Sequence, residues 1–148
     1  MRIPAAKVLI LPARIDNLYD CIDFVASCAA GLEFDQQRID EIRLAVEEVL
    51  VNIINYAYPE NPEPGEIEIA CSVSGDNALI IEIADSGVPF NILSVKDPET
   101  DAEIDDRQIG GLGIYFVKQI MDDVRYAREG GRNRLTLTAG RTRRDIPA

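Results

Sequence analysis

The sequence predicts a single α/β domain of the two-layer α+β type, in which three helices cover one face of a mostly antiparallel, mixed sheet. The chain has 148 residues, a length that fits one domain. Its hydrophobic patterns follow the order strand, helix, helix, strand, strand, long loop, helix, strand, strand. Strands grouped in this way favour an antiparallel sheet with a helical layer, because a doubly wound parallel sheet needs regular alternation of strands and helices.

The first half of the chain supplies one strand and two helices. A short apolar run at residues 6–11 predicts the strand. Residues 15–30 carry apolar side chains at helical spacing, with Asp16 as the expected N-cap and Gly31 as the expected stop. Residues 35–57 carry a longer apolar stripe of the same spacing and predict a second helix, which a proline-rich loop then ends.

The second half supplies four strands and the third helix. Residues 66–73 alternate between two faces, and residues 78–84 follow a hairpin signal, so both segments are predicted strands. Residues 112–121 form the predicted third helix, which starts directly after a glycine run. Residues 124–128 and 134–139 then form a closing hairpin around two glycines.

Charge and hydropathy exclude several classes of partner. The formal net charge is -11, from 26 acidic and 15 basic residues. Such a surface repels the phosphates of nucleic acids, so we expect no DNA or RNA binding. No apolar run approaches the ~20 residues of a membrane span, and the N-terminus lacks the pattern of a secretory signal. We therefore expect a cytoplasmic protein without a membrane partner.

The cysteine and histidine content excludes several kinds of catalytic and metal site. The three cysteines show no CxxC spacing, and Cys21 and Cys28 share one face of the first helix, where a thiol is usually a small core residue. An odd count favours reduced thiols. Histidine is absent, which excludes histidine-based triads, histidine zinc ligands and autophosphorylation on histidine within this chain.

The second helix carries polar residues within an apolar stretch. Glu48, Asn52 and Asn55 lie at i, i+4 and i+7 and share one face. A solvated helix face is the plain alternative, but the apolar neighbours favour a pocket. There the Asn52 oxygen suits Mg²⁺, and Glu48 suits proton removal from an attacking hydroxyl. Glu47 is the rival of Glu48, but its spacing from Asn52 turns it further round the helix.

Asp85 and Gly87 follow the strand at residues 78–84. They form a good turn, and nothing more is needed to explain them. As a site, the Asp85 carboxylate can accept a hydrogen bond from an adenine amino group, while Gly87 lets the backbone approach the base.

A glycine run opens the third helix at Gly110, Gly111 and Gly113, around Leu112. A flexible hinge is the plain alternative. The functional interpretation is stronger, because the backbone N–H groups and the dipole of a helix N-terminus form a phosphate site. The run fits neither the P-loop nor the GxGxxG motif.

The three motifs together resemble the N, G1 and G2 boxes of the Bergerat-type ATP-binding fold, which gyrase, heat-shock chaperone ATPases, MutL and sensor histidine kinases share. The motifs are Glu48-x-x-x-Asn52, Asp85-x-Gly87 and Gly111-x-Gly113. Within that fold the chain is most similar to the small bacterial anti-sigma factor serine/threonine kinases. This similarity is carried by residues 45–54, 107–118, 121–124 and 133–137, and it spans nearly the whole chain.

The resemblance implies a role for each matching residue. Glu48 would be the general base, Asn52 would coordinate Mg²⁺, and Asp85 would bind the adenine amino group beside Gly87. Residues 90–110 would be the ATP lid. The residues implied at the phosphates are Gly110, Gly111, Leu112 and Gly113, the supporting candidates are Asn55 and Arg107, and Thr136 or Thr138 would lie near the adenine.

Two features depart from the family pattern. The G1 box often continues to a second glycine, where this chain has Pro89. The lid is rich in acidic residues, an unusual lining beside a triphosphate, so we expect these side chains to face solvent or a partner. The histidine-kinase branch is disfavoured because the chain has no room for a dimerisation helix pair that carries a phosphoacceptor histidine.

The resemblance implies a serine/threonine protein kinase that uses ATP and Mg²⁺ and phosphorylates a STAS-domain anti-anti-sigma protein. It also allows for sequestration of a sigma factor and for a homodimer. The main alternative is a nucleotide-dependent regulatory binding module without significant kinase activity. A third alternative is a structural domain in which all three motifs serve packing and turns.

Overall fold

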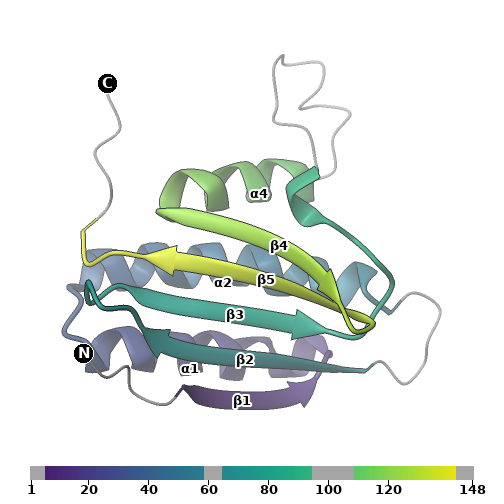
Figure 1. Cartoon of the computed structure of the whole chain (residues 1–148), viewed down its shortest axis with the longest axis horizontal. Coiled ribbons are helices and arrows are strands. Elements are labelled where there is room, and N and C mark those ends of the chain that lie inside the picture. Colours follow the sequence, from purple (N-terminus) through teal and green to yellow (C-terminus); the bar gives the residue numbers. More distant parts are fainter. Residues whose placement is uncertain (1–5, 59–64, 95–108, 143–148) are drawn as a thin grey trace.

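The structure is a computed structural model that describes residues 6–58, 65–94 and 109–142. These residues form one five-stranded sheet and a layer of three α-helices on one of its faces (Figure 1). The strands are β1 (Lys7–Pro12), β2 (Glu66–Val73), β3 (Leu79–Asp85), β4 (Asp123–Glu129) and β5 (Arg132–Ala139). The helices are α1 (Leu18–Gly31), α2 (Gln36–Tyr56) and α4 (Ile109–Ile120), with 3₁₀ turns at Ile15–Asn17 and Ile92–Ser94. The predicted α+β two-layer sandwich is confirmed.

The strand order is β1-β2-β3-β5-β4, and every pairing among the described strands is antiparallel. The parallel pairing that a mixed sheet would contain is not found in this part of the chain. The register of the two central strands sets Asp85, the last residue of β3, opposite Asn133 near the start of β5. Two polar residues from distant parts of the sequence therefore meet at one end of the sheet.

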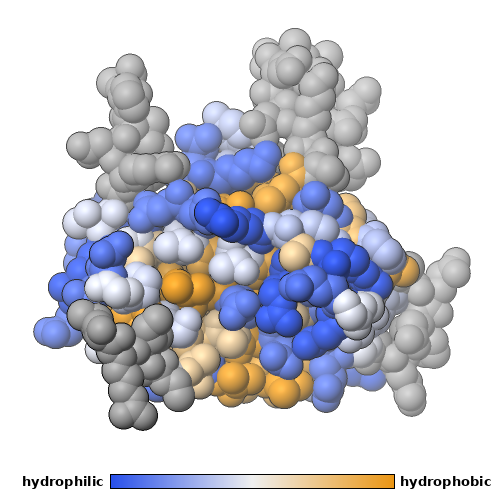
Figure 2. Space-filling view, in the orientation of Figure 1, coloured by the Kyte–Doolittle hydropathy of each residue, from blue (hydrophilic) through white to orange (hydrophobic). Residues whose placement is uncertain are grey.

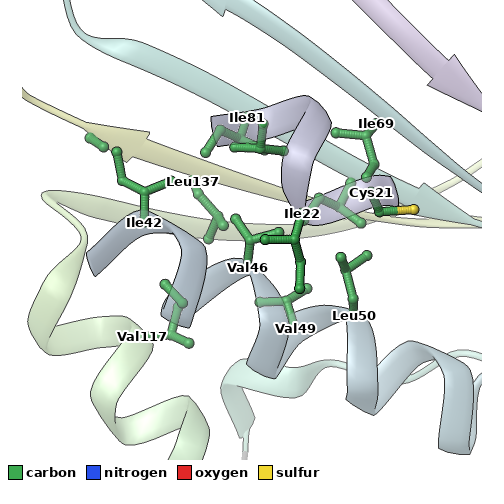
Figure 3. Close-up of a cluster of buried hydrophobic side chains, with 14 of the residues drawn as sticks. Cys21, Ile22, Ile42, Val46, Val49, Leu50, Ile69, Ile81, Val117 and Leu137 are labelled. Atoms are coloured by element: carbon green, nitrogen blue, oxygen red, sulfur yellow. The ribbon is translucent and has the colours of Figure 1, made fainter. Parts of the chain in front are cut away.

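Helix α2 lies in the middle of the helical layer, with α1 on one side and α4 on the other (Figure 1). It begins after Asp35, whose side chain caps the helix by accepting a hydrogen bond from the Arg38 amide at 2.8 Å. Its buried face points at side chains of the sheet and of both other helices (Figure 3). The labelled members of this core are Cys21, Ile22, Ile42, Val46, Val49, Leu50, Ile69, Ile81, Val117 and Leu137.

The predicted start of the first helix is wrong, whereas the predicted stop at Gly31 is confirmed. Asp16 lies inside a 3₁₀ turn, and the residue before α1 is Asn17, whose side chain donates to the Pro12 carbonyl instead of capping the helix. Gly31 is the last helical residue, and the left-handed conformation lies two residues later, at Glu33 with φ 65°. The tight exit is held by backbone bonds to the Ala29 and Ala30 carbonyls, so a glycine is not required there.

The third helix starts three residues earlier than predicted, so the glycine run lies inside the first turns of α4 and not before them. The other end of α4 is tied to α2 by Arg38, which is 2% exposed. The Arg38 guanidinium donates to the carbonyls of Ile120 and Gly140, both at 2.9 Å. A side chain from the start of α2 thus fixes α4 and the end of β5 together.

The face of the sheet away from the helices carries many hydrophilic side chains, with apolar ones along the edge strand β1 and in smaller areas elsewhere on this face (Figure 2). Arg132 and Arg134 on this face pair with Glu68 and Glu82 at 3.6 and 3.2 Å. Such exposed pairs contribute little to stability. No helix in the described ranges combines the length and the apolar character needed to cross a membrane.

Candidate functional site

The three sequence motifs meet between the C-terminal half of α2, the end of β3 and the start of α4. A narrow cleft of about 30 Å³ opens there between α2 and the sheet. Its lining includes Asn52, Ile53, Asp85, Phe90, Tyr126 and Asn133. The structure therefore brings Asn52 of the Glu-Asn motif and Asp85 of the Asp-Gly motif to one cleft. Glu48 does not line the cleft and lies against Gly113 of the glycine run on α4.

Glu48 lies against the backbone of α4. A Cβ atom built on Gly113 would stand only 2.7 Å from Cδ of Glu48 and would overlap its carboxylate. The Glu48 side chain is partly buried there, and this burial, with the charge of neighbouring Glu47 as a second cause, raises the pKa of the Glu48 carboxyl. A carboxylate with a raised pKa is a better proton acceptor than an ordinary one.

Asn52 lies one turn further along α2 and is 5% exposed. Its amide nitrogen donates to the Glu48 backbone carbonyl at 2.8 Å. This bond turns the nitrogen toward the helix and leaves Oδ1 as the atom available to a ligand in the cleft. A neutral oxygen beside a carboxylate fits Mg²⁺, which prefers oxygen ligands and takes the remainder from phosphates and water.

Asp85 is held by two donors on one oxygen. Its Oδ1 accepts from the Gly87 amide at 2.9 Å and from Nδ2 of Asn133 at 3.0 Å. The side chains of Asp85 and Asn133 are both buried, and Asp85 is only 3% exposed. Because both donors use Oδ1, the other carboxylate oxygen is left for a ligand.

Gly87 is required by contact with the protein itself. A Cβ atom at this position would lie 2.6 Å from the carbonyl carbon of Ala57, the C-cap of α2, and the Val88 amide donates to the Ala57 carbonyl at 2.9 Å. The predicted reason, close approach of the backbone to a base, is therefore not needed to explain this glycine. It lets the turn after β3 dock on the end of α2.

Several predicted residues are not brought to the cleft. Thr136 and Thr138 alternate with the buried Leu135 and Leu137 and lie on the outer face of the sheet. Asn55 is exposed and does not line the cleft. Arg107 and most of the predicted lid at residues 90–110 lie outside the described residues.

The glycine run contributes backbone and not side chains. Residues 109–112 form the first turn of α4, where backbone N–H groups have no acceptor within the helix. Gly110, Gly111 and Leu112 therefore lie where the predicted phosphate site requires amides. Gly113 lies in the next turn, in contact with Glu48.

Asn133 is the residue that the motifs miss. It is buried at an inward position of β5, in line with Leu135 and Leu137, and bonds directly to Asp85. The alternation of β5 contains a signal for it, because an asparagine at an inward position is unusual in a strand that is otherwise apolar on that face.

The family model of the histidine kinase-like ATPase domain matches residues 11–139. The chain belongs to the histidine kinase-like ATPase domain family. The match covers both the Glu-Asn motif on α2 and the end of β5, so the cleft lies within the part of the chain that the family defines. ATP use is thus a property of the family to which this domain belongs.

Two curated relatives of this histidine kinase-like ATPase domain are serine-protein kinases named RsbW. The serine-protein kinase RsbW of Oceanobacillus iheyensis is 27% identical over 135 residues, which are 88% of this chain and 79% of the relative. The serine-protein kinase RsbW of Staphylococcus epidermidis is 33% identical over 106 residues, which are 69% of this chain and 65% of that protein.

Solved structures agree with the fold. The RsbU and RsbW domains of a Mycobacterium tuberculosis protein match with a TM-score of 0.62 at 18% identity, over 90% of this chain and 32% of that chain. The SiaB-SiaC complex from Pseudomonas aeruginosa matches with a TM-score of 0.56 at 14% identity, over 93% of this chain and 90% of that chain. At these identities the likeness concerns the architecture of the histidine kinase-like ATPase domain.

Proposed function

We propose that this domain is an ATP-dependent serine/threonine protein kinase that phosphorylates a STAS-domain anti-anti-sigma protein. The single observation that carries the proposal is the position of Glu48, partly buried against α4 and one helical turn from Asn52. A carboxylate with a raised pKa one turn from Asn52 suits proton removal from an acceptor hydroxyl, which favours a kinase over a domain that only binds nucleotide. The name shared by the curated relatives, serine-protein kinase, supports the same activity.

The nucleotide would lie across the cleft from β3 to α4. The free oxygen of Asp85 accepts a hydrogen bond from the adenine amino group at one end. At the other end the first-turn amides of α4, from residues 109–112, donate to the phosphates. Bound Mg²⁺ would neutralise charge on the phosphate oxygens, and Asn52 Oδ1 is the protein atom that would hold it.

Glu48 would act on the acceptor hydroxyl. Phosphoryl transfer depends mostly on positioning and charge stabilisation, and the carboxylate orients the serine and removes its proton. Glu48 is only partly buried, so the hydroxyl of an external protein can reach it. Gly113 keeps the space for the carboxylate clear, because any side chain there would displace it.

The cleft must widen to admit the base. Its volume of about 30 Å³ accommodates ordered water and not a purine. Phe90 and Ile92, which follow β3 at the start of the proposed lid, line the cleft, and the Phe90 ring packs on Tyr56 with centroids 6.2 Å apart. We infer that Phe90 and Ile92 move outward when ATP enters.

The proposal also covers the protein partners of this domain and its location in the cell. The solved SiaB-SiaC complex is an example of a structurally similar protein with a protein partner. Sequestration of a sigma factor and assembly into a homodimer are parts of the same proposal. A cytoplasmic location is another, since all three cysteines are free thiols, as is usual in a reducing compartment.

The competing function is a nucleotide-dependent binding module without kinase activity. Incubation of the pure protein with γ-labelled ATP, Mg²⁺ and a STAS-domain anti-anti-sigma protein separates the two. Label on a serine or threonine of the STAS protein supports the kinase. ATP binding without any transferred label supports the binding module.

A further inference from the structure

Asn133 forms more hydrogen bonds to the walls of the cleft than any other side chain in the described residues, and no motif includes it. It lies near the start of β5, is 6% exposed and stands opposite Asp85 in the strand register. Both Nδ2 and Oδ1 of its side-chain amide form hydrogen bonds. Nδ2 holds Asp85, and Oδ1 holds the orientation of the amide itself.

The nitrogen side faces acceptors. Nδ2 of Asn133 donates to Oδ1 of Asp85 at 3.0 Å and to the Val88 carbonyl at 2.8 Å. With the Gly87 amide, which donates to the same Asp85 oxygen at 2.9 Å, this bond saturates Oδ1. The Asp85 carboxylate is thereby held in one rotation, with Oδ2 as its open acceptor.

The oxygen side faces donors. Oδ1 of Asn133 accepts from the Tyr126 hydroxyl at 2.6 Å, from Nη1 of Arg128 at 3.2 Å and from the Phe90 amide at 3.2 Å. A rotated amide would set its NH₂ group against these three donors, so the network allows only one orientation. The donors on β4 and on the segment after β3 therefore fix the orientation of the Asn133 amide, and the amide in turn fixes the Asp85 carboxylate.

We infer that Asn133 is a positioning residue for base selection: it fixes the Asp85 carboxylate so that the cleft accepts 6-aminopurines and rejects 6-oxopurines. This inference rests on the proposed ATP-binding function. A 6-amino group donates to the open oxygen of Asp85, whereas a 6-oxo group sets one acceptor against another. A buried acceptor left without its donor lowers affinity strongly, and a carboxylate that is free to rotate loses part of this discrimination.

The test compares two nucleotides that differ only in the 6-amino group. ATP and purine riboside triphosphate are titrated with Mg²⁺ into the full chain by calorimetry. Wild type is expected to bind ATP more tightly by roughly tenfold or more. In Asn133→Asp, which keeps an oxygen for the three donors but sets a carboxylate in place of the NH₂ group that donates to Asp85, the Asp85 carboxylate is repelled from its rotation and ATP affinity falls by a similar factor. The affinity for purine riboside triphosphate stays the same.

Tyr126→Phe is the matched control, because it removes one bond to Asn133 and leaves the bond to Asp85 in place. It should keep the preference for ATP. Equal losses for both nucleotides in Asn133→Asp would show a merely structural role and overturn the inference. If Asn133→Asp does not fold, the wild-type comparison still decides, since equal affinities for the two nucleotides contradict base selection through Asp85. Failure of wild type to bind either nucleotide would instead overturn the proposed function.

Discussion

The Glu48 carboxylate lies directly against the backbone of Gly113, where α2 and α4 pack together. A Cβ atom on Gly113 would come within 2.7 Å of the Glu48 side chain at Cδ. This contact joins the first and third sequence motifs, although 65 residues separate them in the chain. The glycine is therefore explained by the position of the carboxylate as well as by its place near the start of α4.

Replacement of Gly113 by alanine should lower the rate of phosphoryl transfer while the protein still folds. Gly113→Ala forces the Glu48 carboxylate aside, and a misplacement of about 1 Å can lower a catalysed rate by roughly a hundredfold. We expect such a loss in phosphoryl transfer to the partner protein, measured with γ-labelled ATP. Gly31→Ala is the control, because a Cβ at this helical glycine meets nothing within 4 Å. Equal rates in the two variants would remove the proposed importance of the contact.

The raised pKa of Glu48 makes a prediction about stability. Burial first, and the charge of Glu47 second, raise the pKa of the Glu48 carboxyl in the folded state above its unfolded value. The folded state then binds more protons than the unfolded state in the window between the ordinary glutamate value of about 4.3 and the raised value, so its stability falls as pH rises through that window. Glu48→Gln removes this cost at neutral pH.

The melting temperature of Glu48→Gln should therefore exceed that of wild type at pH 7 by about 1–2 °C, a small shift because the site is only partly buried. The gain should vanish near pH 3, well below the ordinary glutamate value of about 4.3, where the carboxyl is almost fully protonated in both states. Glu66→Gln, which removes the same charge from an exposed position, should show no comparable gain. A Glu48→Gln variant that is less stable than wild type at pH 7 would contradict burial as the cause.

The sequence locates the motifs better than it assigns the roles around them. Glu48, Asp85 and Gly113 are found because each stands in a local pattern that the chain itself displays. Asn133 is not, since its role comes from a strand register that joins positions 48 residues apart. The expectation of Thr136 beside the adenine overlooks the alternation of β5, which turns that side chain to the outer face.

Contacts that a local sequence pattern does not contain also explain the other differences between the predicted and the observed structure. The cap at Asp16 fits general preferences, but the chain uses a 3₁₀ turn before the helix. The helix does end at Gly31, although the residue with left-handed backbone is Glu33. Arg38 belongs to no motif either, because its carbonyl partners lie 82 and 102 residues further along the chain. Long-range hydrogen bonds of this kind are visible only in the fold.

Asn52 is predicted to act through Mg²⁺. Asn52→Ala removes Oδ1 from the cleft, so it should abolish the increase in ATP affinity that Mg²⁺ gives wild type. Calorimetric titrations with Mg²⁺ and with a chelator measure this difference. Asn55→Ala removes an exposed asparagine from the same helix and should keep the increase. An unchanged Mg²⁺ effect in Asn52→Ala would show that another group holds the ion.

Arg38 is predicted to stabilise the packing of α2 against the end of α4 and the end of β5. Arg38→Met keeps the length of the side chain but leaves the buried Ile120 carbonyl and the partly buried Gly140 carbonyl without this donor, which should lower the free energy of unfolding by about 2–4 kcal/mol. Urea denaturation measures the change. Arg43→Met is the control, since its pair with Asp23 at 3.0 Å is solvent-exposed and should contribute less than about 1 kcal/mol. Equal losses would contradict the anchoring role.

The most direct test of the account is single-turnover phosphoryl transfer from γ-labelled Mg-ATP to the STAS-domain protein, by wild type and by Glu48→Gln at nucleotide concentrations that saturate both. We predict that wild type labels a serine or threonine of the partner, while Glu48→Gln binds ATP with similar affinity and transfers roughly a hundredfold less label or none. Equal labelling by the two proteins would contradict the assignment of Glu48 as the base around which this site is built.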